Sequence, residues 1–367
     1  MPPARLTSRM RRVIGDRSLS ETDVPPELAR EFLREMVRVR VFDERAVALQ
    51  RRGWMSGYPL FRGQEASQVG AAGALTDADW LFPTYRTNAL QLARGRPPTD
   101  ILRFRRGRSE YEAGREGTTF TQSTPIATHL PHAVGAAMAR EYLGDGETGP
   151  AEEGETGPTE EGEAGVACAY FGDGATSEGD FHEAMNFAGV FDAPAVFLCE
   201  NNAWAISLPV ERQTASETLA GKAHAYGFEG IRVDGMDPLA VYETVREARE
   251  SALAGDPVLV ESLTYRRGAH STSDDPDRYR DRESERPDWR TADPLDRYES
   301  FLREAGVVDA SFVPGVREAA ESWVAEAVET VESDSDPSPD DVFAFAYGRA
   351  PPRVAAQRRA LRVRTDE

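Results

Sequence analysis

The stretch VACAYFGDGATSEGDFHEAMNFAGVFDAPAVFLCENNAWAISL, residues 166–208, places two apolar runs on either side of a segment with helical periodicity. Val166–Phe171 is short and rich in β-forming residues, which is typical of a buried strand. The second run, Ala195–Cys199, has the same character and leads into Glu200, Asn201 and Asn202. Between them, one helical face is predicted to carry Phe181, Ala184, Met185, Ala188 and Phe191. The pattern predicts a parallel βαβ unit with its ligand at the carboxyl ends of the strands.

The turn that follows the first strand has the chemistry of a diphosphate site. Gly172, Gly174 and Ala175 allow backbone N–H groups to approach phosphate oxygens at the start of a helix. Asp173 and the side-chain carbonyl of Asn202 are the hard oxygen donors that Mg²⁺ prefers. A Gly-Asp-Gly turn alone would equally suit an ordinary Rossmann turn. The Asn-Asn pair about 29 residues later, at the end of the next strand, is far more specific.

Composition limits the function classes. The chain has 367 residues, enough for a large core, and a formal net charge of −20. Lys222 is its only lysine. The acidity argues against nucleic-acid binding and suggests a halophilic source. Cys168 and Cys199 lie in the two predicted strands, so we interpret them as core residues in a reducing cytosol. No apolar run reaches transmembrane length, which predicts a soluble cytoplasmic protein without membrane contact.

The chain before the 166–208 stretch is predicted to form an extended arm over residues 1–26 and then the start of a catalytic domain over residues 27–349. Residues 27–52 have the pattern of a long amphipathic helix that ends at Gly53, and Ala66–Leu75 that of a tightly packed small-residue helix. A short apolar run from Trp80 ends in Tyr85 and Arg86, a hydroxyl and a guanidinium suited to phosphate, although such a pair is also common on surfaces.

The chain after this stretch repeats the strand–helix–strand pattern. Ile231–Gly235 is predicted as a strand end, Asp237-Pro238 as the start of a helix reaching Leu253, and Pro257–Tyr265 as an apolar strand. That strand leads into a polar loop containing His270, at the same predicted edge of the sheet. A lone loop histidine is more often a surface residue.

The sequence FGDGATSEGDFHEAMNFA…ENNAWAIS resembles the thiamin diphosphate motif of one family, and the resemblance extends over roughly residues 27–349. That family is the alpha subunit of the decarboxylating component of 2-oxo acid dehydrogenase complexes. The resemblance implies an α/β thiamin diphosphate-binding fold, a central parallel sheet with helices on both faces. It also implies oxidative decarboxylation of a 2-oxo acid with acyl transfer to a lipoyl group. The implied partners are a beta subunit, in a heterotetramer, and a lipoyl-bearing acyltransferase.

The resemblance also assigns roles to individual residues. It implies that Mg²⁺ is held by Asp173, Asn202 and the backbone carbonyl of Trp204, and that His270 takes part in catalysis. Tyr85 and Arg86 would contact the diphosphate, together with the turn formed by Gly172, Asp173, Gly174 and Ala175. Thr124 and Ile126 would meet the aminopyrimidine. No direct catalytic role is assigned to Arg62–Ala66.

Some positions depart from the family pattern. Ala269 stands where many relatives have a second histidine, and Glu200 where some have an arginine near the phosphates. Ser123, Pro125 and Thr128 fit a monovalent-cation loop, but His129 replaces a glutamine ligand, so that site is left open. The HSTSDDP loop, residues 270–276, resembles the branched-chain type more than the pyruvate type, with an acetoin dehydrogenase as a further alternative. A nucleotide-binding protein and a non-catalytic paralogue are the remaining alternatives. The sequence has neither a P-loop motif nor the third Rossmann glycine.

Two further segments lie outside the predicted core. Residues 144–165 contain a Gly-Pro-Glu repeat that cannot bury a core and is predicted to be a disordered acidic insertion. Pro294–Glu304 and Pro314–Glu332 have amphipathic helical patterns, and Val342–Tyr347 is predicted as a short apolar anchor. Residues 350–367 form a basic tail that could pair with an acidic partner surface.

Overall fold

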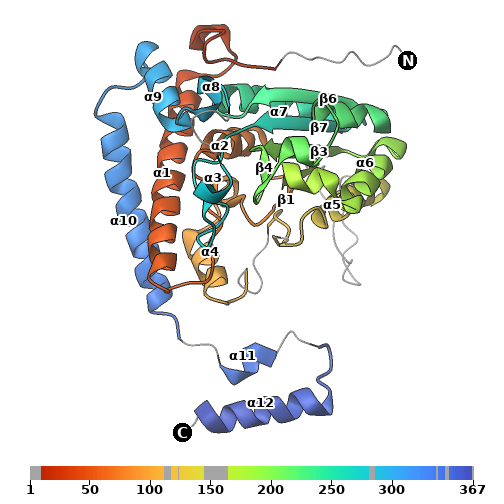
Figure 1. Ribbon diagram of the computed structural model, residues 1–367, viewed down its shortest axis with the longest axis vertical. Coiled ribbons are helices and arrows are strands. Elements are labelled where there is room, and N and C mark those ends of the chain that lie inside the picture. Colours follow the sequence, from red (N-terminus) through yellow and green to blue (C-terminus); the bar gives the residue numbers. More distant parts are fainter. Residues whose placement is uncertain are drawn as a thin grey trace, which may run out of the picture.

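A five-stranded, all-parallel sheet forms the centre of the computed structural model, which describes residues 10–110, 117–122, 124–143, 164–280, 286–335, 338–343 and 347–365 (Figure 1). The strand order is β1-β2-β3-β7-β6. The bounds are β1 Trp80–Phe82, β2 Ala167–Gly172, β3 Ala195–Asn201, β6 Glu229–Asp234 and β7 Val258–Leu263. A small antiparallel hairpin, β4 Trp204–Ala205 with β5 Leu208–Pro209, follows β3. The predicted parallel sheet is confirmed, as is the α/β fold class.

Strands β2, β3 and β7 are buried along almost their whole length, because helices cover both faces of the sheet. Alternate residues of β2 enter two different cores. Cys168 and Tyr170 pack on the side of α1 Pro26–Arg51, α2 Glu65–Ala74 and α7 Pro238–Leu253. Ala169 and Phe171 pack on the side of α5 His129–Leu143 and α6 Gly179–Val190. Cys168 and Cys199 are both buried free thiols, as expected for core residues.

The small-residue helix α2 lies directly on α7. A Cβ on Gly70 would come within 2.5 Å of the Pro238 carbonyl oxygen, so this contact requires glycine. Asp237 caps α7 by accepting hydrogen bonds from the backbone N–H groups of Leu239 and Ala240. The predicted cap and the predicted close packing are therefore both found. The remaining helices are α3 Asn88–Ala93, α4 Pro98–Arg105, α8 Asp288–Thr291, α9 Pro294–Glu304, α10 Phe312–Glu332, α11 Pro339–Phe343 and α12 Pro352–Thr365.

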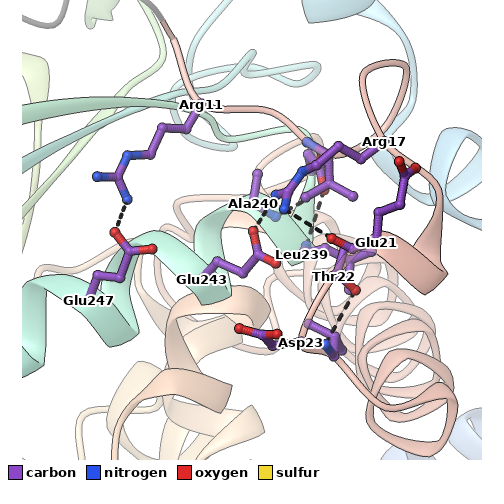
Figure 2. A network of polar contacts seen from close by, with 12 residues as sticks. Arg11, Arg17, Glu21, Thr22, Asp23, Leu239, Ala240, Glu243 and Glu247 are labelled. Atoms are coloured by element: carbon purple, nitrogen blue, oxygen red, sulfur yellow. Dashed lines mark hydrogen bonds and ion pairs between the residues drawn. The ribbon is translucent and has the colours of Figure 1, made fainter.

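The described part of the predicted N-terminal arm is attached to the sheet edge. Arg11 forms a parallel bridge with Val233 of β6, and Val13 is fully buried. Figure 2 shows the side chains of Arg11 and Arg17 directed at Glu247 and Glu243 of α7, with which they form ion pairs. Residues 10–24 therefore belong to the α/β body, because apolar side chains within this polar segment are buried in its core.

The prediction for Phe191 is wrong. It was expected on the buried face of α6, but it follows the end of the helix, is 40% exposed and stacks on Phe187. Of the predicted anchor, residues 342–347, Val342 and Tyr347 are 60% and 50% exposed, and residues 344–346 lie outside the described residues. Of the acidic insertion, residues 144–163 lie outside the described residues. In the basic tail, α12 packs on α11, where Arg358 pairs with Asp340.

Candidate active site

A cavity of about 170 Å³ lies at the carboxyl edge of the sheet, where β2 and β3 end and the loop after β7 folds back. Nearly all the residues predicted from the sequence to form the site contribute to its wall. The cavity is lined by Thr84, Tyr85, Arg86, Ile126, Gly172, Asp173, Gly174, Ala175, Glu200, Asn202, Trp204, Ala205, Ile206, Arg266 and His270. Thr124 is exposed and is not among these lining residues. A larger groove, of about 560 Å³, lies far from them between α1 and α10 and is mostly apolar.

The Gly-Asp-Gly turn is a short 3₁₀ segment, Asp173–Ser177, between β2 and α6. The Thr176 hydroxyl donates to the Asp173 carbonyl at 2.9 Å, which closes the turn. A Cβ on Gly174 would lie 2.9 Å from the Ala205 Cβ, so glycine allows the β4 segment to approach the turn. The turn therefore brings its backbone close to the cavity, as the sequence predicted.

Asp173 and Asn202 present oxygen atoms from adjacent strand ends. Asp173 is 1% exposed and accepts a hydrogen bond from Gln213 Nε2 at 3.1 Å, while burial raises the pKa of its carboxyl. The Asn202 amide is oriented by Gln64, whose Oε1 accepts from Nδ2 at 3.0 Å. One carboxylate and one amide carbonyl form the kind of donor set that suits Mg²⁺ bound together with phosphate oxygens and water.

The donor set fits magnesium better than a transition metal. Within the residues that the structure describes, no group of three or more His, Cys, Asp and Glu side chains could hold a metal ion by itself. A Mg²⁺ site completed by phosphate and water needs no such group, because Mg²⁺ keeps several non-protein ligands. Gln64 belongs to the RGQEA segment, residues 62–66, which was assigned no direct role. It contacts the predicted metal ligand Asn202 through the hydrogen bond given above.

Two buried guanidinium groups converge on His270. Arg86 Nη2 lies 3.0 Å and Arg266 Nη1 3.2 Å from His270 Nδ1, and Arg86 Nη2 also donates to the His270 carbonyl at 2.8 Å. Because a guanidinium can only donate, Nδ1 is the acceptor and the ring proton is on Nε2. Burial, followed by the charges of Arg86 and Arg266, lowers the pKa of His270 to about 3. His270 is therefore a neutral imidazole.

This cluster is suited to an anion. Among the described residues, neither Arg86 nor Arg266 forms an ion pair with a carboxylate, and the buried Arg266 Nε has no hydrogen-bond partner. Burial, followed by the charge of Arg86, lowers the pKa of Arg266 to about 10, so the guanidinium stays protonated at neutral pH. An anionic ligand in the cavity would compensate both positive charges. Arg266 was missed by the sequence analysis, although it follows the same strand end as His270.

Glu200 gives the cavity wall one further carboxyl group. It is 3% exposed, and its Oε1 accepts hydrogen bonds from the Tyr170 hydroxyl at 2.7 Å and from Gln68 Nε2 at 3.4 Å. Burial raises the pKa of Glu200 to about 7. The structure therefore places Glu200 at the cavity, at the position where some relatives have an arginine.

The loop after β7 is fixed by hydrogen bonds around Asp274. Its carboxylate accepts from the His270 backbone N–H at 2.7 Å and from the Tyr279 hydroxyl at 2.6 Å. The Tyr279 hydroxyl in turn accepts from Arg266 Nη2 at 3.1 Å. These contacts hold His270 at the cavity.

The residues of the possible cation loop are found in different roles. His129 is 1% exposed, and its Nε2 lies 2.9 Å from the Tyr170 carbonyl oxygen. Burial lowers the pKa of His129, so the neutral ring donates to this carbonyl and joins α5 to β2. The Thr128 hydroxyl donates to the Pro125 carbonyl at 2.9 Å. Ser123 lies outside the described residues.

Comparison with known proteins matches the sequence of this chain to a family. Residues 33–340 match the model of the dehydrogenase E1 component. The chain belongs to the dehydrogenase E1 component family. It is 44% identical over 351 residues to the 3-methyl-2-oxobutanoate dehydrogenase subunit alpha of Mycobacterium tuberculosis, covering 94% of this chain and 90% of that protein. It is 36% identical over 340 residues to the pyruvate dehydrogenase E1 component subunit alpha of Bacillus subtilis, covering 91% and 86%.

Within this family the chain is similar to alpha subunits of 2-oxo acid dehydrogenases, as its sequence indicated. The family is generally dependent on thiamin diphosphate. In the described part of the chain, no helix combines the length and the apolar character that crossing a bilayer requires.

Proposed function

We propose that this chain is the alpha subunit of a thiamin diphosphate- and Mg²⁺-dependent 2-oxo acid dehydrogenase that transfers an acyl group to a lipoyl group. The observation that carries the proposal is the cavity itself. It is lined by Asp173 and Asn202 together with Arg86, Arg266 and His270. These are metal-binding oxygens beside buried cations, the two features that a metal–diphosphate ligand requires.

Different residues of the proposed site would bind different parts of the cofactor. Asp173, Asn202 and the Trp204 backbone carbonyl would hold Mg²⁺, with Gln213 and Gln64 orienting the first two. Tyr85, Arg86, Gly172, Gly174 and Ala175 would contact the diphosphate, and Arg266 would add a second guanidinium. Ile126, at the cavity wall, and Thr124, which is exposed outside it, would meet the aminopyrimidine.

Thiamin diphosphate supplies, when bound, the carbon nucleophile and the electron sink that decarboxylation needs. His270 contributes an Nε2–H donor, because Arg86 and Arg266 occupy Nδ1. A neutral N–H donor can stabilise, by hydrogen bonding, negative charge that develops near the reacting carbon or on a lipoyl sulfur. A non-catalytic paralogue would have no need to hold a histidine in this orientation.

We favour a branched-chain 2-oxo acid as substrate. The support is the HSTSDDP loop, residues 270–276, and the 44% identity to a relative named for 3-methyl-2-oxobutanoate. Pyruvate is the second candidate, because the relatives at 36% identity are named for it, and acetoin dehydrogenase the third. The proposed setting is a cytoplasmic heterotetramer with a beta subunit, serving a lipoyl-bearing acyltransferase, in a halophilic organism.

The metal claim is tested by Asp173→Asn in the chain co-expressed with its beta subunit. Calorimetry should detect Mg²⁺-dependent binding of thiamin diphosphate to the wild type and at least a hundredfold weaker binding to the variant, because the only carboxylate at the predicted metal is lost. Glu217→Gln removes the same charge at an exposed position and should bind normally. Equal binding by wild type and Asp173→Asn would refute the site.

The substrate claim is tested with the same complex and an artificial electron acceptor. Decarboxylation of 3-methyl-2-oxobutanoate should exceed that of pyruvate in kcat/KM. A preference for pyruvate or acetoin would assign the chain to one of the other two dehydrogenases. Binding of a nucleotide in place of thiamin diphosphate would support the nucleotide-binding alternative.

A further inference from the structure

Lys222 is the only lysine in the sequence, in a chain whose other permanently charged basic side chains are all arginine. It lies in the 3₁₀ segment Ala220–Tyr226, which packs against α6, β6 and β7. Lys222 is not among the site residues predicted from the sequence, and it does not line the cavity. Its side chain is half-buried and directed at the turn that carries Asp173.

The ammonium group makes two hydrogen bonds to a single residue of that turn. Lys222 Nζ donates to the Thr176 carbonyl at 2.8 Å and to the Thr176 hydroxyl oxygen at 3.1 Å. The Thr176 hydroxyl donates in turn to the Asp173 carbonyl. The same ammonium lies 5.6 Å from the centre of the Phe181 ring at the start of α6. A continuous chain of contacts therefore leads from Lys222 through Thr176 to Asp173.

The turn depends on such contacts because it has little regular structure of its own. Asp173–Ser177 is a five-residue 3₁₀ segment, so few backbone hydrogen bonds hold it. Gln213 holds the Asp173 carboxylate from one side, and Lys222 holds the far end of the turn from the other. Hydrogen bonds from a charged donor are the stronger kind. A compact ammonium can serve a carbonyl and a hydroxyl of one residue, whereas a guanidinium spreads its donors over a planar fork.

We propose that Lys222 is a positioning residue that fixes the Asp173–Ser177 turn in the shape that presents Asp173 to a divalent metal. This inference rests on the proposed metal–diphosphate site. Lys222 touches neither cofactor nor substrate, and it acts through Thr176. Its loss should weaken metal-dependent cofactor binding while leaving turnover at saturation nearly intact.

The test compares Lys222→Met, which keeps the volume of the stem, with Lys222→Arg, in the chain co-expressed with its beta subunit. Lys222→Met should weaken Mg²⁺-dependent thiamin diphosphate binding by about tenfold, the loss of roughly one charge-assisted hydrogen bond. Its kcat at saturating cofactor should stay within about twofold, and Lys222→Arg should recover most of the affinity. Arg140→Met is the matched control, because Arg140 also donates to a loop carbonyl, that of Ala78, but away from the cavity.

Hydrogen exchange in the cofactor-free protein separates this inference from the proposed function. The amides of residues 173–177 should exchange about tenfold faster in Lys222→Met, with β7 unchanged. If the wild type binds no thiamin diphosphate, the proposed function fails, yet the exchange result still tests the turn. If Lys222→Met binds cofactor as the wild type does, or exchanges identically, the positioning role is refuted. Should Lys222→Met fail to fold, Thr176→Val interrupts the same chain of contacts and should weaken binding similarly; normal binding by it would then refute the role.

Discussion

His270 illustrates at the scale of one residue how neighbours set a protonation state. A histidine buried in its neutral form binds its proton more weakly in the folded chain than in the unfolded chain. Its pKa of about 3 means that, between about pH 6.5 and 3, the unfolded chain takes up a proton that the folded chain does not. The contribution of His270 to stability therefore falls as the pH falls through this range. Above about pH 6.5 it carries no such penalty.

We expect Arg266→Gln to raise the pKa of His270, because it removes one of the two positive charges that face the ring. An NMR titration of the imidazole signal in the cofactor-free chain measures this directly. The acid-side loss of stability should become shallower in the same variant. Arg303→Gln changes an exposed arginine of α9 and should leave the His270 titration unaltered. A midpoint in Arg266→Gln equal to that of the wild type would show that the Arg266 charge does not contribute to the value.

At the scale of the secondary-structure elements, a four-residue helix fastens two strand ends. Arg290 of α8 is 7% exposed and donates from Nε to the Thr264 carbonyl at 2.8 Å and from Nη2 to the Asn201 carbonyl at 2.7 Å. These carbonyls lie where β7 and β3 end, directly before the loops that carry Arg266 and Asn202. The Asn201 carbonyl also accepts from the Thr264 backbone N–H at 2.9 Å, so the guanidinium adds a charged donor there and ties both strand ends to α8.

We expect Arg290→Met to lower the free energy of unfolding by about 2–4 kcal/mol, since two buried carbonyl oxygens would each lose a charged donor. Urea unfolding of the cofactor-free chain gives this number. Arg303→Met removes an exposed arginine and should change stability by less than about 0.5 kcal/mol. A similarly small effect for Arg290→Met would mean that other groups or water satisfy the carbonyls.

The strands and the polar groups at their ends were predictable, because apolar runs identify buried strands and parallel strands place their carboxyl ends at one edge. The order β1-β2-β3-β7-β6 was not, since the sequence does not specify which strand lies beside which. Arg290 and Arg266 were not predicted. Arg290 donates to two backbone carbonyls, which every residue has and no motif marks. Arg266 meets His270, Ile206 and Tyr279, which only the fold brings together. Phe191 was misplaced because helical periodicity was continued past the point where α6 ends.

At the scale of the whole molecule, the chain is strongly acidic, yet apolar side chains are exposed beside the cavity. The formal net charge of −20 favours solvation and repels other copies of the chain. Beside the cavity, Ile126, Ile206 and Leu208 are 36%, 55% and 41% exposed. Ile206 also has a positive φ of 55°, an unfavourable conformation for a β-branched residue, and its carbonyl accepts from Arg266 Nη2 at 3.1 Å. Apolar side chains held at the edge of a charged cavity are typical of a surface that a partner covers.

The chain alone is expected to be inactive. Thiamin chemistry needs a carboxylate hydrogen-bonded to the aminopyrimidine, to relay the proton from the reacting carbon. Among the described residues, the carboxyl groups that line the cavity are Asp173, which serves the predicted metal, and Glu200, which Tyr170 and Gln68 hold at the end of β3. We therefore expect the missing carboxylate to come from the beta subunit, across the edge formed by Ile126, Ile206 and Leu208.

With thiamin diphosphate, Mg²⁺ and an artificial electron acceptor supplied, the isolated chain should decarboxylate a 2-oxo acid at less than about 1% of the rate measured after the beta subunit is added. Ile206→Asp, which places a charge on the covered edge, should weaken assembly with the beta subunit and leave the fold of the isolated chain intact. Full turnover by the isolated chain would mean that a group of its own, such as Glu200, relays the proton.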